Sequence, residues 1–107
     1  MQDIYNKVLG LLKSYFNCNN WENLFLNGGC YWLANFLHDR ISETYLVINR
    51  VDEHCALSIS GKVYDVTGEI SGRNFHRASD REISFMKKNY KPKFDVVELS
   101  DFLIKNI

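Results

Sequence analysis

The sequence lacks an excess of charge of either sign, because thirteen basic and thirteen acidic residues cancel to a formal net charge of zero. It also lacks a run of like charges long enough to form a basic or acidic tail. Nucleic-acid-binding domains gather positive charge on one face, so the composition speaks against nucleic acid as a partner. We therefore expect a protein or peptide as substrate or partner, and no nucleic acid.

Long hydrophobic runs are missing as well. No apolar stretch approaches the roughly 20 residues that a membrane-spanning helix needs. The first residues, MQDIYNKVLG, carry an early aspartate, and no basic segment or small-residue cleavage site is present. We expect a cytoplasmic protein without a membrane segment.

Cysteine is scarce and odd in number, with only Cys18, Cys30 and Cys55. This argues against a disulfide scaffold and leaves at least one thiol free. A metal site built from Cys30, His38, His54 and Cys55 would lack the close paired spacing of zinc ligands, so we expect no metal and no cofactor.

Proline occurs once, and repeats and low-complexity segments are missing. The chain of 107 residues is 46% hydrophobic and 14% aromatic, which suits a single packed domain spanning residues 1–107. Helical periodicity predicts helices over residues 2–16 and 30–41. Ser79 with Glu82 forms a capping-box signature that opens a third helix or an irregular helical turn, which ends before Pro92.

β-forming residues dominate three segments between residues 44 and 68 and predict three strands. The segment KFDVVEL, residues 93–99, predicts a further strand, and Ser100 the cap of a short C-terminal helix. The predicted fold class is α+β, with N-terminal helices, one of them opening at Cys30, packed on an antiparallel sheet.

The hairpin around Ser60 and Gly61 has a predictable register. If Ile59 faces Lys62 across a two-residue loop, His54 and Asp65 become diagonal neighbours on one face, within reach of a hydrogen bond. Small residues on this same face would admit the helix that begins at Cys30. A thiol, an imidazole and a carboxylate would then converge.

These three groups suit nucleophilic catalysis. A helix N-terminus and a neighbouring imidazolium both favour a thiolate at Cys30, while His54 would move the proton and Asp65 would orient the ring. Gly28 and Gly29 permit a sharp turn that exposes the sulfur. Asn27, Gly29 and the backbone N–H groups at the helix start are candidate oxyanion donors, and Trp32 is a candidate substrate contact.

The segments GGCYWLANFL and HCALSISGKVYDVTG, within residues 27–68, resemble the core of the papain-like cysteine peptidase superfamily, especially small NlpC-type and transglutaminase-like members. The resemblance implies a papain-like core in which Cys30 is the nucleophile, His54 the base and Asp65 the orienting residue. The glutamine that precedes the cysteine in papain-type enzymes has no counterpart here.

The sequence thus predicts a small thiol hydrolase or transamidase that acts on amide bonds, as a peptidase, amidase or deamidase, through an acyl-enzyme. Arg73 and His76 would line its substrate cleft. The alternatives are a non-catalytic protein-binding module on the same fold, such as a phage or mobile-element inhibitor of a host protein, and a purely structural subunit. The sequence leaves the substrate and the oligomeric state open.

Overall fold

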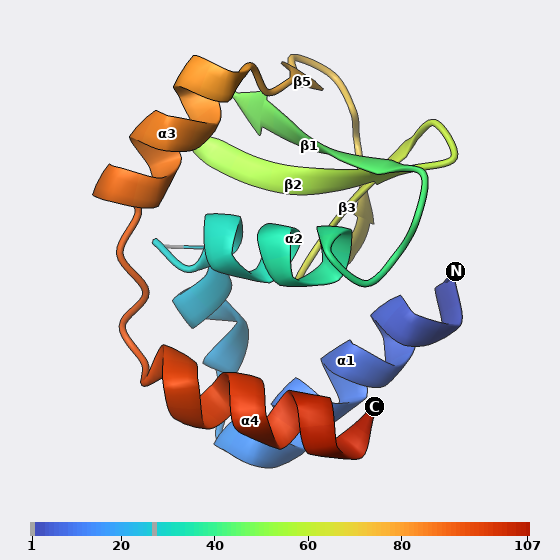
Figure 1. Ribbon diagram of the computed structural model, residues 1–107, viewed down its shortest axis with the longest axis vertical. Helices are drawn as coiled ribbons and strands as arrows, with labels where there is room; N and C mark the ends of the chain where they lie inside the picture. Colours follow the sequence, from blue (N-terminus) through green and yellow to red (C-terminus); the bar gives the residue numbers. More distant parts are fainter. Residues whose placement is uncertain (1, 27) are drawn as a thin grey trace.

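The computed structural model describes residues 2–26 and 28–107, and it has an α+β fold. Within these residues four α-helices and one 3₁₀ helix accompany one five-stranded antiparallel sheet (Figure 1). The helices are α1 (Gln2–Phe16), η1 (Trp21–Phe25), α2 (Cys30–His38), α3 (Asp80–Asn89) and α4 (Val96–Asn106). The strands are β1 (Thr44–Asn49), β2 (His54–Ile59), β3 (Lys62–Asp65), β4 (Gly68–Ile70) and β5 (His76–Arg77).

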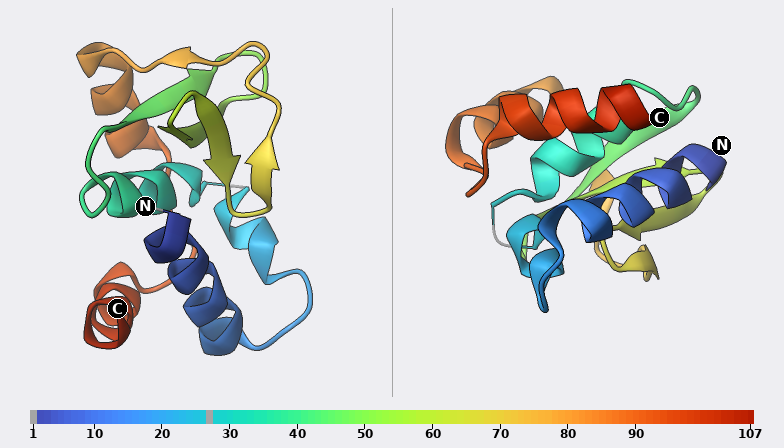
Figure 2. Two further views of the ribbon diagram at one scale, coloured as in Figure 1. Left: turned by 90° about the vertical axis from the view of Figure 1, so that its right-hand side faces the viewer. Right: turned by 90° about the horizontal axis from the view of Figure 1, so that it is seen from below.

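The helix α2 is the centre of the molecule. It lies between the sheet on one side and the pair α1 and α4 on the other, while α3 flanks the end of the sheet (Figure 1). The view from below shows α1 and α4 together beneath α2 (Figure 2). Both sides of α2 are therefore covered, and six of its nine residues are buried. This double coverage holds the start of α2, and with it Cys30, in a fixed place.

The sheet has the strand order β4-β3-β2-β1-β5. The β2–β3 hairpin turns at Ser60 and Gly61, which both have positive φ, at 51° and 82°, as a tight two-residue hairpin loop requires. Its register pairs Ile59 with Lys62 and Leu57 with Tyr64, which confirms the predicted register.

The position of α2 on the sheet was predicted wrongly. It packs on the face that carries Cys55, Leu57 and Ile59, and these residues share one hydrophobic core with α2. The opposite face, with Ala56, is covered by the segment that connects β4 to β5, including Phe75. The larger apolar side chains of the first face supply more buried area to a helix than small residues do, and this decides the packing.

The predictions for the two ends of the chain differ in accuracy. Gln2–Phe16 forms the predicted first helix, and the Ser79–Glu82 capping box is present at the start of α3. The prediction of a strand at residues 93–99 is wrong, because residues from Val96 onward form α4. The Asp95 carboxylate accepts hydrogen bonds from the backbone N–H groups of Val97 and Glu98 and so caps the helix.

Candidate functional site

His54 and Asp65 form the central pair of the candidate site. His54 begins β2, Asp65 ends β3, and Nε2 of His54 lies 2.9 Å from Oδ2 of Asp65. The other carboxylate oxygen of Asp65 accepts the Thr67 backbone N–H at 2.7 Å and also the Thr67 hydroxyl. These bonds fix the carboxylate, so Asp65 holds the imidazole in one orientation.

The surroundings of His54 favour its charged form. Burial by itself opposes an imidazolium, but the hydrogen bonds with Asp65 and then with the Cys30 thiol outweigh it and raise the pKa of His54 to about 9. Burial also opposes the charged form of Asp65, yet the bonds from His54 and Thr67 lower the pKa of this carboxyl. At neutral pH the pair is therefore an imidazolium and a carboxylate.

Cys30 completes the group from the first position of α2. Because Asp65 occupies Nε2 of His54, the ring nitrogen left for the thiol is Nδ1. The thiol therefore lies beside the imidazole at the N-terminal end of α2. The three residues that the sequence singled out are thus brought together, with Cys30 approaching His54 from the helix.

The two glycines before Cys30 have separate structural roles. Gly28 has φ of 101°, and a Cβ there would lie 2.6 Å from the backbone oxygen of Lys91. A Cβ on Gly29 would lie 2.3 Å from the backbone oxygen of Leu24. Both positions therefore exclude a side chain, and the chain can turn sharply into the helix only with glycine.

The expected oxyanion donors need revision. The Gly29 N–H donates to the Leu24 carbonyl at 3.1 Å and is not available to a substrate. The first bond of the helical ladder runs from Leu33 N–H to Gly29 O, so the N–H groups of Cys30 and Tyr31 precede the ladder. These two groups are the better donors. Asn27 lies outside the described residues.

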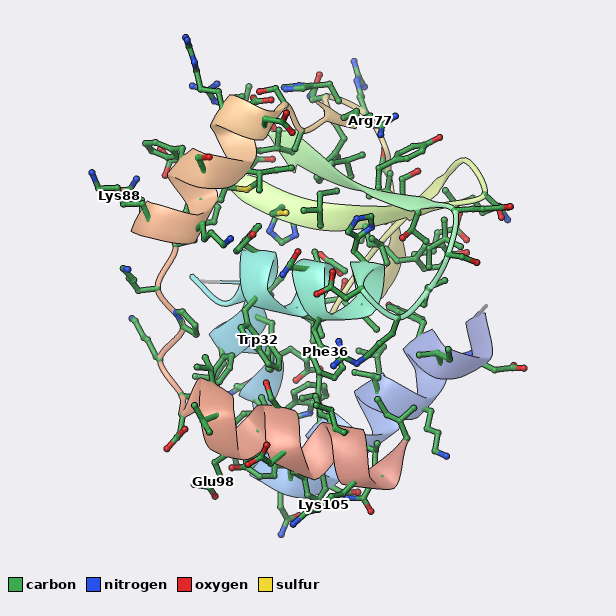
Figure 3. The ribbon with its side chains drawn as sticks, in the orientation of Figure 1. Trp32, Phe36, Arg77, Lys88, Glu98 and Lys105 are labelled. Carbon is green, nitrogen blue, oxygen red and sulfur yellow. The ribbon has the colours of Figure 1, made fainter. Side chains whose placement is uncertain are left out.

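Trp32 was expected beside the cysteine as a substrate contact, but it points away from the sheet. It lies on the side of α2 that faces α4, together with Phe36 (Figure 3). Its ring stacks on Phe36 with centroids 5.3 Å apart and meets the edge of Phe94 at the same distance. Trp32 is therefore part of the aromatic core, where its large apolar surface is best buried.

Access to the thiol is narrow. Cys30 is only 4% exposed, and the cavity beside it measures about 10 Å³, room for at most one water molecule. A larger groove of about 490 Å³ lies on the outer side of His54, and we call it the His54 groove. It is lined by Leu26, Asn49, Asp52, His54 and Asp65, together with Ile70, Ser71, Arg73, Asn74 and Phe75.

Of the two loop residues expected to line the cleft, the structure brings one to the site. Arg73 lines the His54 groove. His76 instead lies 2.9 Å from Glu82 of α3 and belongs to a separate surface cluster. Sequence reasoning missed Phe75, whose ring meets the His54 ring edge-on at 6.1 Å, and Tyr90, which follows α3. In the sequence, the only feature that could have pointed to Phe75 and Tyr90 is that both are aromatic residues next to polar loops.

The other cysteines differ from Cys30 in their surroundings. Cys18 is exposed, whereas Cys55 is buried on the helix-covered face of the sheet. Burial, together with the nearby Cys30, raises the pKa of the Cys55 thiol. Within residues 2–26 and 28–107, no three histidine, cysteine or acidic side chains are grouped so that they could hold a metal ion.

None of the described helices is long and apolar enough to cross a membrane.

Comparison with known proteins places the chain in a family other than the expected one. Neither the curated proteins nor the solved structures give a match. The family model described as phage YunG-like protein matches residues 8–104, nearly the whole chain.

This match corrects the resemblance to papain-like cysteine peptidases, which was wrong, and with it the assignment as a cysteine peptidase or thiol protease. The motifs behind it were short. Two glycines before Cys30 are required by the close approach of Leu24 and Lys91, so local packing accounts for them without shared ancestry with a peptidase. The chain belongs to the phage YunG-like family.

Proposed function

We propose that the protein is a thiol-dependent enzyme that hydrolyses or transfers the acyl group of an amide bond, with Cys30 as nucleophile. The observation that carries the proposal is the His54–Asp65 pair at 2.9 Å, whose imidazole lies close enough to the Cys30 thiol, at the start of a helix, for the thiol to help raise the pKa of His54. A nucleophile, a base and a group that orients the base are the parts that such chemistry needs.

The chemistry proceeds in two steps. The Cys30 thiolate attacks the amide carbonyl and forms a C–S bond, and the C–N bond breaks as the His54 imidazolium gives its proton to the leaving amine. Water or a second amine then attacks the thioester carbonyl and forms a C–O or C–N bond while its proton passes to His54. The C–S bond breaks, which releases the acyl group and restores the Cys30 thiolate. The N–H groups of Cys30 and Tyr31 would bind the carbonyl oxygen in both steps.

The substrate we propose is a protein or peptide, because the His54 groove is open and broad rather than a deep pocket for a small molecule. We also propose a cytoplasmic location, since a free thiol nucleophile persists in a reducing compartment.

One observation favours a second candidate function, a protein-binding module without catalysis. Cys30 is almost fully buried, and a sulfur that stays covered cannot attack a substrate. In such a module the three residues would serve only to fix the end of the hairpin against α2.

Alkylation by iodoacetamide, mapped to each cysteine by mass spectrometry between pH 5 and 9, separates the two functions. We expect Cys30 to react at pH 6 and to lose this reactivity in His54→Ala, because the imidazolium stabilises the thiolate. The exposed Cys18 is the internal reference, and the buried Cys55 should stay unreactive. A Cys30 that stays inert in the folded protein, or that reacts equally with and without His54, would refute the enzyme.

A further inference from the structure

A second groove, of about 340 Å³, lies between the β1–β2 turn, the start of α2 and the end of α3. We call it the Tyr90 groove. Its side chains of interest are Asp52, Glu53, Phe85, Asn89 and Tyr90.

Two aromatic rings form one wall of the Tyr90 groove. Phe85 is 58% exposed, which is unusual for a phenylalanine on a helix that could have turned it inward. Its ring centroid lies 6.4 Å from that of Tyr90, with the rings at 76°. Burial raises the pKa of Tyr90, so the phenol is neutral at physiological pH. The wall therefore offers ring faces and one neutral hydroxyl.

The charge on the groove is negative. Asp52 and Glu53 both line it, and none of the other described residues that line it is charged. Arg50 and Arg81 line the adjoining groove, which shares Glu53, Phe85 and Tyr90, and Arg50 lies 3.3 Å from Glu82 in an ion pair. One oxygen of Asp52 accepts a hydrogen bond from the Asn49 side chain at 3.1 Å, which holds this carboxylate in place. Carboxylates beside exposed aromatic faces are complementary to a cation.

The Tyr90 groove adjoins the candidate active site. It shares Leu26 and Asp52 with the His54 groove, and its wall includes Gly28, two residues before Cys30. Figure 1 shows the start of α2 beneath the end of α3, and residues next to both of these ends line the groove. Figure 3 shows Lys88 of α3 extending away from the molecule, so this lysine does not occupy the groove.

We propose that the Tyr90 groove binds a basic side chain, lysine or arginine, of the polypeptide whose amide bond reaches Cys30. The placement next to the reacting bond rests on the proposed function, whereas the binding of a cation rests only on Asp52, Glu53, Phe85 and Tyr90. The groove would thus select substrates with a basic residue close to the amide that is attacked.

The test uses Cys30→Ala protein, so that binding is measured without chemistry. Nα-acetyl-lysine N-methylamide and its norleucine analogue, which has the same backbone but no ammonium, are titrated by ¹H–¹⁵N NMR. We expect the lysine probe to perturb the amides of Glu53, Asn89 and Tyr90 and to bind at least about fivefold more tightly than the norleucine probe. Glu53→Gln and Phe85→Leu should each weaken the binding of the lysine probe by at least about threefold.

Glu69→Gln is the matched control, because Glu69 is an exposed carboxylate on β4 that does not line the groove. It should leave the affinity unchanged. Equal binding of the two probes, perturbation confined to other parts of the surface, or no binding at all would overturn the proposal. The outcome is independent of the alkylation experiment, so an inert Cys30 with an intact lysine preference would refute the enzyme and leave the cation site standing.

Discussion

Replacing Asp65 by asparagine should lower the pKa of His54 substantially. In the parent protein this pKa is raised from 6.5 to about 9, against the effect of burial and chiefly by the hydrogen bond with Asp65. At about 1.36 kcal/mol per pKa unit, the difference corresponds to roughly 3 kcal/mol of preference for the imidazolium. The asparagine keeps the shape but not the charge, so burial, which opposes the imidazolium, should then lower the pKa of His54 clearly below 9.

The measurement is the titration of the imidazole Cε1–H resonances by NMR, with His54 assigned by comparison with His54→Ala. Glu69→Gln removes a carboxylate from the neighbouring strand β4 and should leave the His54 titration unchanged. A midpoint near 9 in folded Asp65→Asn would refute the claim that Asp65 controls the charge of this ring.

The same pair makes stability depend on pH. Because the folded-state pKa of His54 is raised, its stabilising contribution is fully present below about 6.5 and is lost as the pH rises through about 9. The parent should therefore lose roughly 3 kcal/mol of unfolding free energy between pH 6 and pH 10 through this group, and Asp65→Asn should lose clearly less. Urea unfolding of both proteins at the two pH values measures the difference, and identical losses would contradict the linkage.

Four further substitutions test the local packing and backbone geometry of the fold. Gly28→Ala should destabilise the protein by about 1–3 kcal/mol, because Gly28 has positive φ and abuts the Lys91 carbonyl. Gly10→Ala, in an open position of α1, should instead stabilise it by about 0.5–1 kcal/mol. Leu57→Ala empties the fully buried centre of β2 and should cost about 2–5 kcal/mol. Asp95→Ala removes the cap of α4 and should cost about 1 kcal/mol. Urea unfolding measures all four, and a Gly28→Ala protein as stable as Gly10→Ala would contradict the role of the turn.

Local interactions made much of this protein predictable from its sequence. The capping box of Ser79 and Glu82 involves residues three apart, and the Ser60–Gly61 loop fixes the hairpin register from within the hairpin. The His54–Asp65 hydrogen bond follows from that register, and so it too could be predicted.

Segments with competing local signals needed the tertiary structure. The pair Val96 and Val97 favours a strand, and Asp95 favours a helix start; burial of Leu99 and Leu103 in the core settles the choice for α4. The short strands β4 and β5 depend on pairing with β3 and β1, and their own sequences give little sign of it.

The sequence by itself determined the α+β class, the hairpin and the pairing of an imidazole with a carboxylate, because each depends on residues close along the chain. Only the tertiary structure decided which face of the sheet α2 covers, that Trp32 belongs to the core, and that Gly29 N–H is already bonded to Leu24. It also brought Tyr90 and Phe85 of the α3 region beside the start of α2. These placements depend on which apolar surfaces are buried against each other, and residues far apart in the chain decide that together.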